Sequence, residues 1–454
     1  MADDAGRPSF ARKVAKATWR VDNPAEGALT VRYRYLAKVF DAGSSYVDEH
    51  VAYFNGSNLF LYPAGRLEEP CALRLAGRKA DTPIATGLRA TDDPQVFLAQ
   101  SYHQLVDCPT VVSRNLRQFT AQVDGLALHV HFYGRYEAPA GAEDTLLHQL
   151  GAIIRAQRAV FGELPPGVDE YHFIYLLVPY QFRHAVEHLN NSVYVLPESV
   201  AASAQAFSGL YNISSHEFWH VWNVKSLRPA AMWPYDYDNE PATGLHWFTE
   251  GVTDYYASLM LVRAGLTRPQ QYLNQLEAHL TNMQNAPGAA LVSPEASSHD
   301  SWLHGSNYQD KAAAASYYAL GLRLGWWLDM RIRAQTDSRR SLDDVFRWLY
   351  QAYYKNGQGV PEDGVLLALE QVTGHDWKDF YRRYVQQPTP PDYEEILAGT
   401  GLRVTLAPDT TARPVRLAGL LNWDLAPDDG WQVLALLPGG DLWNAGLAEG
   451  DILL

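Results

Sequence analysis

The stretch His216-Glu217-Phe218-Trp219-His220 carries more information about the fold than any other part of this sequence. On a helix the two histidines lie at positions i and i+4 on one face, where both imidazoles can reach one metal ion. Glu217 lies beside that pair and is placed to take a proton from a metal-bound water. The pattern alone is weak support, because it arises by chance in many helices whose histidines are only partly buried. A third ligand and its supporting contacts are therefore needed downstream.

A candidate third ligand follows in a stretch whose apolar spacing predicts a helix beginning at Thr249. Glu250 and Asp254 are four residues apart and so share one face of that helix. Glu250 can act as the third ligand, with Asp254 behind it accepting the free N–H of a ligand histidine. Glu240 competes for the role, but a proline follows it directly and no carboxylate lies four residues later. Two histidines and a glutamate leave a fourth position open for water, which is the arrangement of a catalytic rather than a structural zinc site.

These residues resemble the core of the glycyl aminopeptidases that carry a C-terminal PDZ domain. That family lies within the thermolysin-like clan of zinc peptidases whose third ligand is glutamate. The resemblance implies one Zn²⁺ ion per chain, bound by His216, His220 and Glu250, with Glu217 as the general base. It extends over most of the chain, and its most specific segments are residues 216–229, 234–237 and 247–251.

A tyrosine pair, Tyr317 and Tyr318, lies three residues before Gly321. The segment is similar to the Tyr-x-x-Gly segment of these and related aminopeptidases, where the tyrosine hydroxyl donates a hydrogen bond to the tetrahedral oxyanion. The resemblance implies this role for Tyr318, or for Tyr317 if the register differs by one residue. A phenol suits the role, because it can donate to a developing negative charge without competing for the metal. Without the resemblance, two adjacent tyrosines on an apolar helix indicate core packing.

Related aminopeptidases also hold the substrate's free amino group with a glutamate, in a short Gly-x-x-Glu segment at a strand edge. The matching run here implies that Glu187 binds the amine. His184 and Ala185 stand where the two glycines are expected. Glycine would allow close approach of the backbone to a substrate, so the departure leaves substrate geometry and activity on standard substrates open. Glu187 could instead be a solvated loop carboxylate.

The composition limits the partners and the compartment. The chain has 454 residues and a formal net charge of -14, with no run of Lys or Arg, which argues against nucleic acid or an anionic membrane surface as a partner. No signal-type apolar segment or run of 18 apolar residues is present, so a cytoplasmic location is expected. Cys71 and Cys108 lack a metal-binding spacing and fit reduced thiols, with one disulfide as the alternative. The sequence gives no oligomeric state.

The length and patterning predict an α+β multidomain protein. Residues 1–143 are expected to form an N-terminal β-sandwich-like domain, because Leu29–Tyr35 and Leu126–Phe132 alternate with period two. His129 and His131 lie on one face of the second strand and could bind a metal. No third ligand is near them in sequence, so an exposed strand face is the preferred interpretation.

Residues 144–387 are expected to form a thermolysin-like catalytic domain with an α/β half and a helical half. Apolar spacing from Leu146 to Val160 predicts an amphipathic helix, and a strand is predicted at 173–178 before the metal-binding helices. The rest, to about Val385, is predicted to be mostly helical. Ser341, followed by two aspartates, is a candidate helix N-cap.

Residues 388–454 are expected to form a linker and an incomplete PDZ-like domain. Pro388–Pro391 predicts the linker, because consecutive prolines stop helices and stiffen the chain. Gln432–Leu437 predicts a strand, and Asn444–Leu453 resembles the turn and strand of a PDZ domain. The segment is about half the length of such a domain, so either the sequence is truncated or the module is incomplete.

The function predicted from these residues is a zinc-dependent aminopeptidase acting on peptides. A preference for small N-terminal residues, glycine or alanine, is implied by the resemblance alone. One alternative is an endopeptidase that uses the same metal and base without depending on Glu187. Another is a catalytically weak scaffold that binds peptides, against which Glu217 and Tyr318 argue, because a scaffold needs neither a base nor an oxyanion donor.

Overall fold

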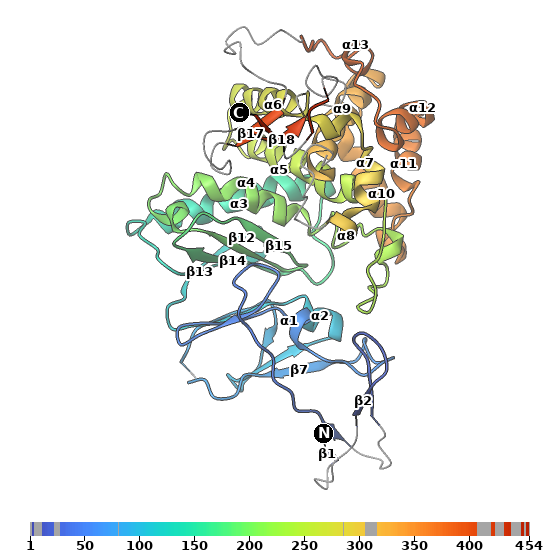
Figure 1. Ribbon diagram of the computed structural model, residues 1–454. Helices are drawn as coiled ribbons and strands as arrows, with labels where there is room; N and C mark the ends of the chain where they lie inside the picture. Colours follow the sequence, from blue (N-terminus) through green and yellow to red (C-terminus); the bar gives the residue numbers. More distant parts are fainter. Residues whose placement is uncertain are drawn as a thin grey trace. The chain divides into compact units, whose positions relative to one another are not determined.

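The computed structural model describes residues 2–3, 11–21, 28–79, 81–284, 286–304, 316–405, 419–422, 431–436, 446–448 and 451–453. Contacts between residues divide the chain into two compact units (Figure 1). Unit 1 comprises Met1–Arg117 and Tyr235–Pro241, and unit 2 comprises Gln118–Pro234 and Ala242–Leu454. The molecule is thus a mixed α/β protein with N-terminal β-sheets and a large helical part.

Unit 1 consists mainly of short strands. They are β1 (Ala2–Asp3), β2 (Ala11–Lys13), β3 (Trp19–Val21), β4 (Leu29–Thr30), β5 (Tyr46–Val47), β6 (Ala52–Phe54), β7 (Cys71–Arg74), β8 (Ile84–Ala85), β9 (Arg89–Ala90), β10 (Val96–Ala99) and β11 (Thr110–Val112), with short helices α1 (Gly56–Leu59) and α2 (Tyr102–Val106). The larger sheets have the orders β5-β6-β11-β8 and β7-β10-β9, and their neighbouring strands pair antiparallel. Tyr53 and Val111 pair across β6 and β11 and are fully buried. Alternating apolar residues therefore make the inner face of these sheets.

Unit 2 is built on a five-stranded sheet with the order β12-β13-β14-β16-β15. Its strands are β12 (Arg117–Val123), β13 (Leu126–Tyr133), β14 (Glu170–Val178), β15 (His184–Glu187) and β16 (Asn191–Pro197). β13, β14 and β16 are parallel, and β15 lies at the edge, antiparallel to β16. A two-residue turn at Asp124 and Gly125, with φ of 49° and 90°, joins β12 to β13, as Asp-Gly pairs do in tight hairpins. The edge strand β15 thus ends at Glu187.

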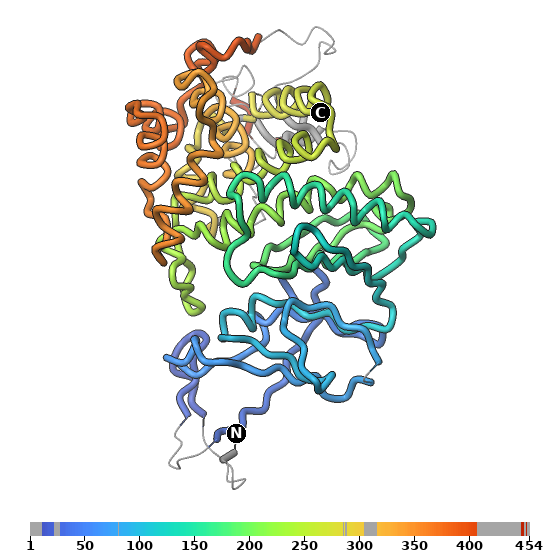
Figure 2. Tube along the Cα trace, turned by 180° about the vertical axis from the view of Figure 1, so that it is seen from behind, coloured from blue at the N-terminus to red at the C-terminus, as the bar shows by residue number. Residues whose placement is uncertain are grey.

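Two helices, α3 (Ala142–Phe161) and α4 (Ser208–Trp219), lie along one face of this sheet, as both views show (Figures 1 and 2). α3 is the crossover that joins parallel strands β13 and β14. Leu128 on β13 and Leu150 on α3 belong to the same buried cluster, which runs through the main core of the unit. The Tyr175 hydroxyl lies 2.8 Å from the Ser214 hydroxyl and ties β14 to α4. This packing fixes the C-terminal end of α4 against the sheet.

The rest of unit 2 is mostly helical, as the sequence predicts. Its elements are η1 (Glu198–Ala201), η2 (Ala230–Met232), η3 (Trp247–Gly251), α5 (Val252–Arg263), α6 (Pro269–Gln284), η4 (Pro287–Ala290), α7 (Pro294–His299), α8 (Ser301–His304), α9 (Tyr317–Gln335), α10 (Leu342–Ala352), η5 (Tyr354–Asn356), α11 (Gly364–Thr373), α12 (Lys378–Tyr381), η6 (Arg382–Gln386) and α13 (Tyr393–Ile396). The predicted cap at Ser341 is confirmed: its side chain accepts from the backbone of Asp344, and the Asp344 side chain accepts from the backbone of Ser341. Pro388–Pro391 lies in the non-helical segment between η6 and α13.

Two expectations for the N-terminal region are wrong in detail. The strand predicted over Leu29–Tyr35 is limited to Leu29–Thr30, and the residues that follow it have no regular structure up to a bridge at Lys38. His131 is buried, with 3% of its surface exposed, rather than lying on an exposed strand face. The reason is that β13, which was assigned to the N-terminal domain, pairs with β14 in the interior of the large sheet.

Near the C-terminus, β17 (Gly419–Asn422), β18 (Trp431–Leu436) and β19 (Ile452–Leu453) form a three-stranded antiparallel sheet. The strand predicted at Gln432–Leu437 therefore exists, shifted by one residue. Of the PDZ-like segment Asn444–Leu453, the structure describes residues 446–448 and 451–453. Cys71 and Cys108 form no disulfide bond. Among the described residues, no helix is long and apolar enough to cross a membrane.

Candidate active site

The histidine pair lies at the end of α4, where the helix is covered on most sides. His216 and Glu217 are in its last turn, and His220 is the C-cap with helical backbone angles (φ -62°, ψ -16°). All three are buried, with His220 only 1% exposed. The helical spacing is thus kept through the whole motif, and the rings of His216 and His220 lie 4.7 Å apart.

Glu250 completes a three-ligand group with the two histidines. Its Oε2 atom lies 3.4 Å from His216 Nε2 and 3.5 Å from His220 Nε2. Donor atoms about 2.0–2.1 Å from a tetrahedral ion lie about 3.3 Å from one another. Both distances from Glu250 therefore match the spacing that zinc requires, all three ligand atoms lie within 4.8 Å of one another, and the donor set fits that metal.

Glu250 lies in a π-helical turn, η3, directly before α5, rather than in a continuous α-helix beginning at Thr249. π-turns leave some backbone carbonyls without the usual helical partner. Here the Asn223 side chain donates to the carbonyl of Phe248 at 2.9 Å and to the Thr253 hydroxyl at 3.1 Å. The loop after α4 thus holds the turn that carries the third ligand.

Each histidine is oriented by a partner on its other ring nitrogen. His216 Nδ1 lies 2.8 Å from Asp254 Oδ1, and His220 Nδ1 donates to the carbonyl of Asn223 at 2.6 Å. Both partners accept, so both Nδ1 atoms carry the proton and both Nε2 lone pairs point toward Glu250. The sequence found Asp254 from its spacing but gave no role to Asn223, because a backbone oxygen leaves no signature in residue type. Outer partners of this kind fix the tautomer of metal-binding histidines.

The charges of the group favour a cation at its centre. Burial alone would lower the pKa of both histidines, but Asp254 and Glu250 outweigh it at His216, and Glu250 and Glu187 outweigh it at His220. The pKa of His220 rises to about 9, and that of His216 lies well above its usual value. Burial would raise the pKa of Glu250, yet the two histidines hold it well below its usual range. A divalent ion supplies the positive charge that these groups otherwise draw from protons.

Two further carboxylates lie close to the ligands. Burial raises the pKa of Glu217 to about 7, while the charges of His216 and His220 act against that rise. Glu187, at the end of edge strand β15, offers a carboxylate oxygen that lies with one from Glu217 and a nitrogen of His220 within 4.8 Å of one another. Glu187 is therefore part of the site and not a solvated loop residue. Glu240, the rejected alternative ligand, pairs instead with Lys16 at 2.7 Å within unit 1.

Of the tyrosine pair, Tyr318 lies beside the ligands. Its ring stacks on that of His216 with centroids 6.2 Å apart, whereas Tyr317 lies against His246 at 5.5 Å. Tyr318 is 38% exposed, so its burial is partial. That partial burial raises the pKa of Tyr318 above its usual value, and the nearby charge of Glu250 acts in the same direction. The phenol therefore stays protonated and able to donate. The geometry favours Tyr318 over Tyr317 as a donor into this site.

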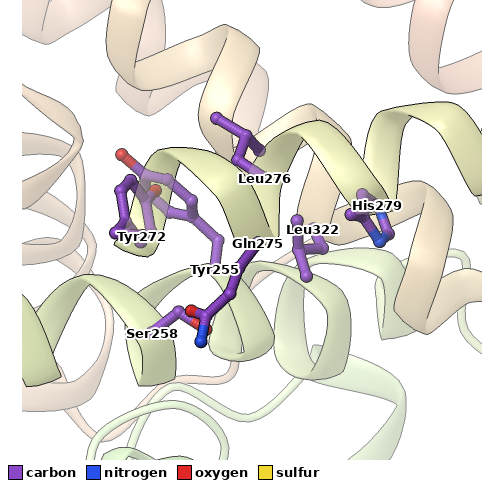
Figure 3. A pocket seen from close by; sticks show the side chains of 7 residues that line it. All are labelled: Tyr255, Ser258, Tyr272, Gln275, Leu276, His279 and Leu322. Atoms are coloured by element: carbon purple, nitrogen blue, oxygen red, sulfur yellow. The ribbon is translucent and has the colours of Figure 1, made fainter. Parts of the chain in front are cut away.

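Figure 3 shows a separate pocket formed by side chains of α5, α6 and α9. Its volume is only about 40 Å³. None of its lining residues is a predicted site residue. They are Tyr255, Ser258, Tyr272, Gln275, Leu276, His279 and Leu322. The metal-binding geometry described above does not depend on this pocket.

Comparison with solved structures shows the same fold in known peptidases. An aminopeptidase N family protein from Idiomarina loihiensis is 24% identical, with a TM-score of 0.86, and the match covers 99% of this chain and 79% of that one. An M1 zinc metallopeptidase from Deinococcus radiodurans, and a mutant of it, are 14% identical with a TM-score of 0.51, covering 85% of this chain and 83% of theirs. A search of curated proteins found no match.

Two family models match the sequence itself. The model of the M61 glycyl aminopeptidases matches residues 209–324, which hold the three candidate ligands, Glu217 and Tyr318. The model of the M61 N-terminal domain matches residues 1–114. Together they cover just over half of the chain, and the chain therefore belongs to the M61 peptidase family.

Proposed function

We propose that this chain is a zinc-dependent aminopeptidase that hydrolyses the N-terminal bond of peptides. Membership of a peptidase family and the three-ligand group support the peptidase part of the proposal. The observation that carries the aminopeptidase part is the closeness of Glu187 to Glu217 and His220, within 4.8 Å. The amine nitrogen and the carbonyl carbon of one residue are only roughly 2.5 Å apart. An ammonium paired with Glu187 therefore brings the first peptide carbonyl next to Glu217, with no room for further residues before it.

The metal would be one zinc ion held by His216, His220 and Glu250. When bound there, it polarises the scissile carbonyl and lowers the pKa of its water ligand toward about 7. Glu217 accepts the proton of the attacking water and passes it to the departing amine. Asp254 and the Asn223 carbonyl keep the two imidazoles in the tautomer that leaves their Nε2 atoms free. The burial of His216, Glu217 and His220 limits the access of bulk water to these side chains.

Tyr318 and Glu187 position the substrate at its two reacting ends. Tyr318 donates a hydrogen bond to the oxygen on which negative charge develops, and its raised pKa keeps its proton in place at neutral pH. Glu187 binds the N-terminal ammonium. A preference for glycine or alanine at the first position follows from the family, whose members are described as glycyl aminopeptidases. The thermolysin-like assignment, the PDZ-like tail, the domain limits and the cytoplasmic location remain predictions from the sequence.

A substitution of the base tests this proposal. Glu217→Gln keeps the shape of the side chain and removes its basicity, so zinc should remain bound at the wild-type level. Hydrolysis of a glycyl chromogenic amide should fall by about 10²–10⁴-fold. Zinc content by elemental analysis and the rate are measured on the same preparation. If Glu217→Gln retains activity, Glu217 is not the general base. If this variant loses zinc, its rate does not test the base, and Glu217→Asp is measured instead.

A further inference from the structure

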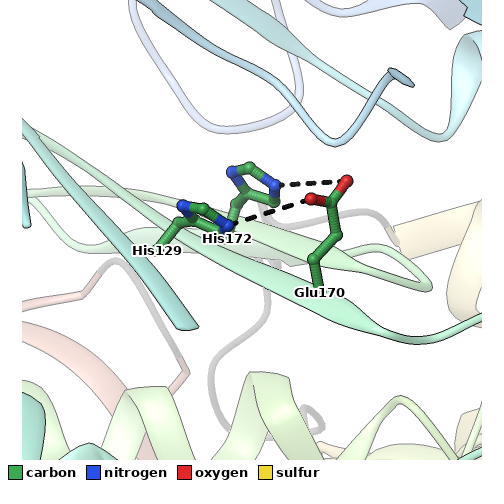
Figure 4. A group of neighbouring side chains, drawn as sticks. All are labelled: His129, Glu170 and His172. Atoms are coloured by element: carbon green, nitrogen blue, oxygen red, sulfur yellow. Dashed lines mark ion pairs between the residues drawn. The ribbon is translucent and has the colours of Figure 1, made fainter. Parts of the chain in front are cut away.

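A second group of potential metal ligands lies on the large sheet of unit 2, away from the site described above. Figure 4 shows His129 of β13 and His172 of β14 side by side, both turned toward the Glu170 carboxylate. His129 Nε2 lies 3.8 Å from one Glu170 oxygen, and His172 Nε2 lies 3.7 Å from the other. One ligand atom from each residue lies within 4.8 Å of the other two.

The strand pairing explains why these residues meet. β13 and β14 are parallel, and in their register His129 is the direct partner of His172 while Glu170 pairs with Ala127. The sequence missed the group because its members lie on two strands that are separated by α3. Spacing within one strand cannot reveal a third ligand that a neighbouring strand supplies.

The group lies on the face of the sheet opposite α3 and α4. Leu128 and Val130 of β13 belong to the core that includes α3, and neighbouring strand residues point to opposite faces. The same alternation separates His172 from Tyr171, whose ring lies 4.7 Å from Phe218 of α4. The motif on α4 and the cluster of His129, Glu170 and His172 are therefore two different sites.

One ring nitrogen in the cluster lacks a hydrogen bond among the described residues. His172 is 7% exposed, and its Nε2 atom is buried without a hydrogen-bond partner among the described residues. Its other nitrogen, Nδ1, lies 3.0 Å from His131 Nε2, and His131 Nδ1 lies 3.0 Å from the Gln118 side-chain nitrogen. As placed, the Gln118 side-chain nitrogen donates to His131 Nδ1, so His131 donates from Nε2 to His172 Nδ1 and the proton of His172 lies on Nε2. Metal binding at His172 Nε2 needs that proton on Nδ1, and the reversed chain of hydrogen bonds supplies this tautomer when the Gln118 amide turns so that its oxygen accepts.

We propose that His129, His172 and Glu170 bind a divalent transition-metal ion of the zinc type, with His131 orienting His172. Imidazole and carboxylate are the donors such ions prefer, and the Glu170 carboxylate places a negative charge beside the two rings. The His129 and His172 rings are 11° from parallel with centroids 4.4 Å apart. Binding therefore requires the His129 ring to turn about its Cβ–Cγ bond toward the His172 Nε2 atom, while the contact with His131 holds the His172 ring in place. The side chains of His129 and Glu170 are 27% and 36% exposed, which gives an ion a route in.

The bound ion would join β13 to β14 and so stabilise the sheet that carries Glu187 and supports α4. We assign the cluster a binding and stabilising role. This inference does not depend on the proposed peptidase mechanism.

The test measures zinc binding in untagged, metal-stripped protein in which the first site has been removed by His216→Ala and His220→Ala. One equivalent of Zn²⁺ should still bind, and it should raise the melting temperature. Adding His129→Asn should weaken that binding at least tenfold, whereas His148→Asn, a change at an exposed histidine of α3, should leave it unchanged. Circular dichroism checks that each variant is folded.

The wild-type protein provides the second arm if the double variant does not fold. It should bind two equivalents, and His129→Asn should bind one while keeping peptidase activity. A single equivalent that is lost with His216 and His220 but not with His129 overturns the inference. If the protein binds a single equivalent of zinc that only His129→Asn abolishes, the second site is supported and the zinc proposed at the catalytic site is contradicted. Zinc bound only weakly and equally by all variants also overturns it.

Discussion

Gly251 and Gly321 touch backbone to backbone where η3 crosses α9. A Cβ built on Gly321 would lie 2.7 Å from the Cα of Gly251 and would overlap the carbonyl oxygen of Trp247. Because Glu250 precedes one glycine and Tyr318 lies a turn before the other, this close crossing sets the distance between the third ligand and the candidate oxyanion donor. No residue with a side chain fits at either position without moving the two helical segments apart.

Gly321→Ala should therefore reduce activity without removing the metal. We expect overpacking to lower stability by about 1–3 kcal/mol and kcat to fall, since Tyr318 moves with α9, while zinc content stays at the wild-type level. Gly209→Ala is the matched control, because its Cβ would meet only a Val200 methyl at 3.6 Å. Equal kcat for Gly321→Ala and wild type would show that the crossing does not position Tyr318.

Asp254 should control the affinity for zinc. Its carboxylate accepts from His216 Nδ1 at 2.8 Å, so Asp254→Ala removes the partner that fixes the ring. We expect zinc affinity to fall about 10–100-fold, measured by competition with a chelator. Asp254→Asn keeps an accepting oxygen and should lose less. If both variants bind zinc as tightly as wild type, the hydrogen bond has no part in metal binding.

Glu187 should matter for substrates with a free amine. Glu187→Gln removes the negative charge that pairs with the ammonium, a charge-assisted contact worth about 1.5–3 kcal/mol. We expect kcat/KM for glycyl amides to drop by about 10–100-fold, mostly through KM, with zinc content unchanged. Glu187→Asp should recover part of the loss. A drop confined to kcat would point to a role in the chemical step instead of amine binding.

Asp344 should contribute pH-dependent stability through the cap of α10. Burial alone would raise its pKa, but hydrogen bonds from Arg347 and the Ser341 backbone outweigh burial and lower it. A carboxyl whose pKa is lower in the folded state stabilises the fold above its unfolded pKa of about 3.9, and that contribution is lost as the pH falls through the folded value. Asp344→Ala should cost about 1 kcal/mol at pH 7 and much less near pH 3. The melting temperature measured across this range checks the sign, and an equal cost at both pH values would contradict it.

The sequence was most informative where the chemistry is local. Three predicted features lie within one or two helical turns, and the structure keeps the spacing of each. They are the motif of His216, Glu217 and His220, the pair Glu250 and Asp254, and the helix cap at Ser341. The N-terminal strand after Leu29 was overpredicted, because alternation alone does not supply a pairing partner.

Features that depend on distant segments could not be read in this way. The π-turn at Glu250 is held by Asn223 from another loop, and the burial of His131 comes from a neighbouring parallel strand. The Gly251 and Gly321 contact needs the packing of η3 on α9. In each case the sequence shows the residue itself, but the residue that it contacts lies far away along the chain.

We propose that Glu187 and the metal-binding group together select a free N-terminus. The most direct test compares hydrolysis of a glycyl chromogenic amide with that of its N-acetylated form by the zinc-loaded wild-type protein. We expect cleavage of the free-amine substrate and at least a 100-fold lower kcat/KM for the acetylated one. Comparable cleavage of both would contradict it and indicate an endopeptidase that uses the same metal and base.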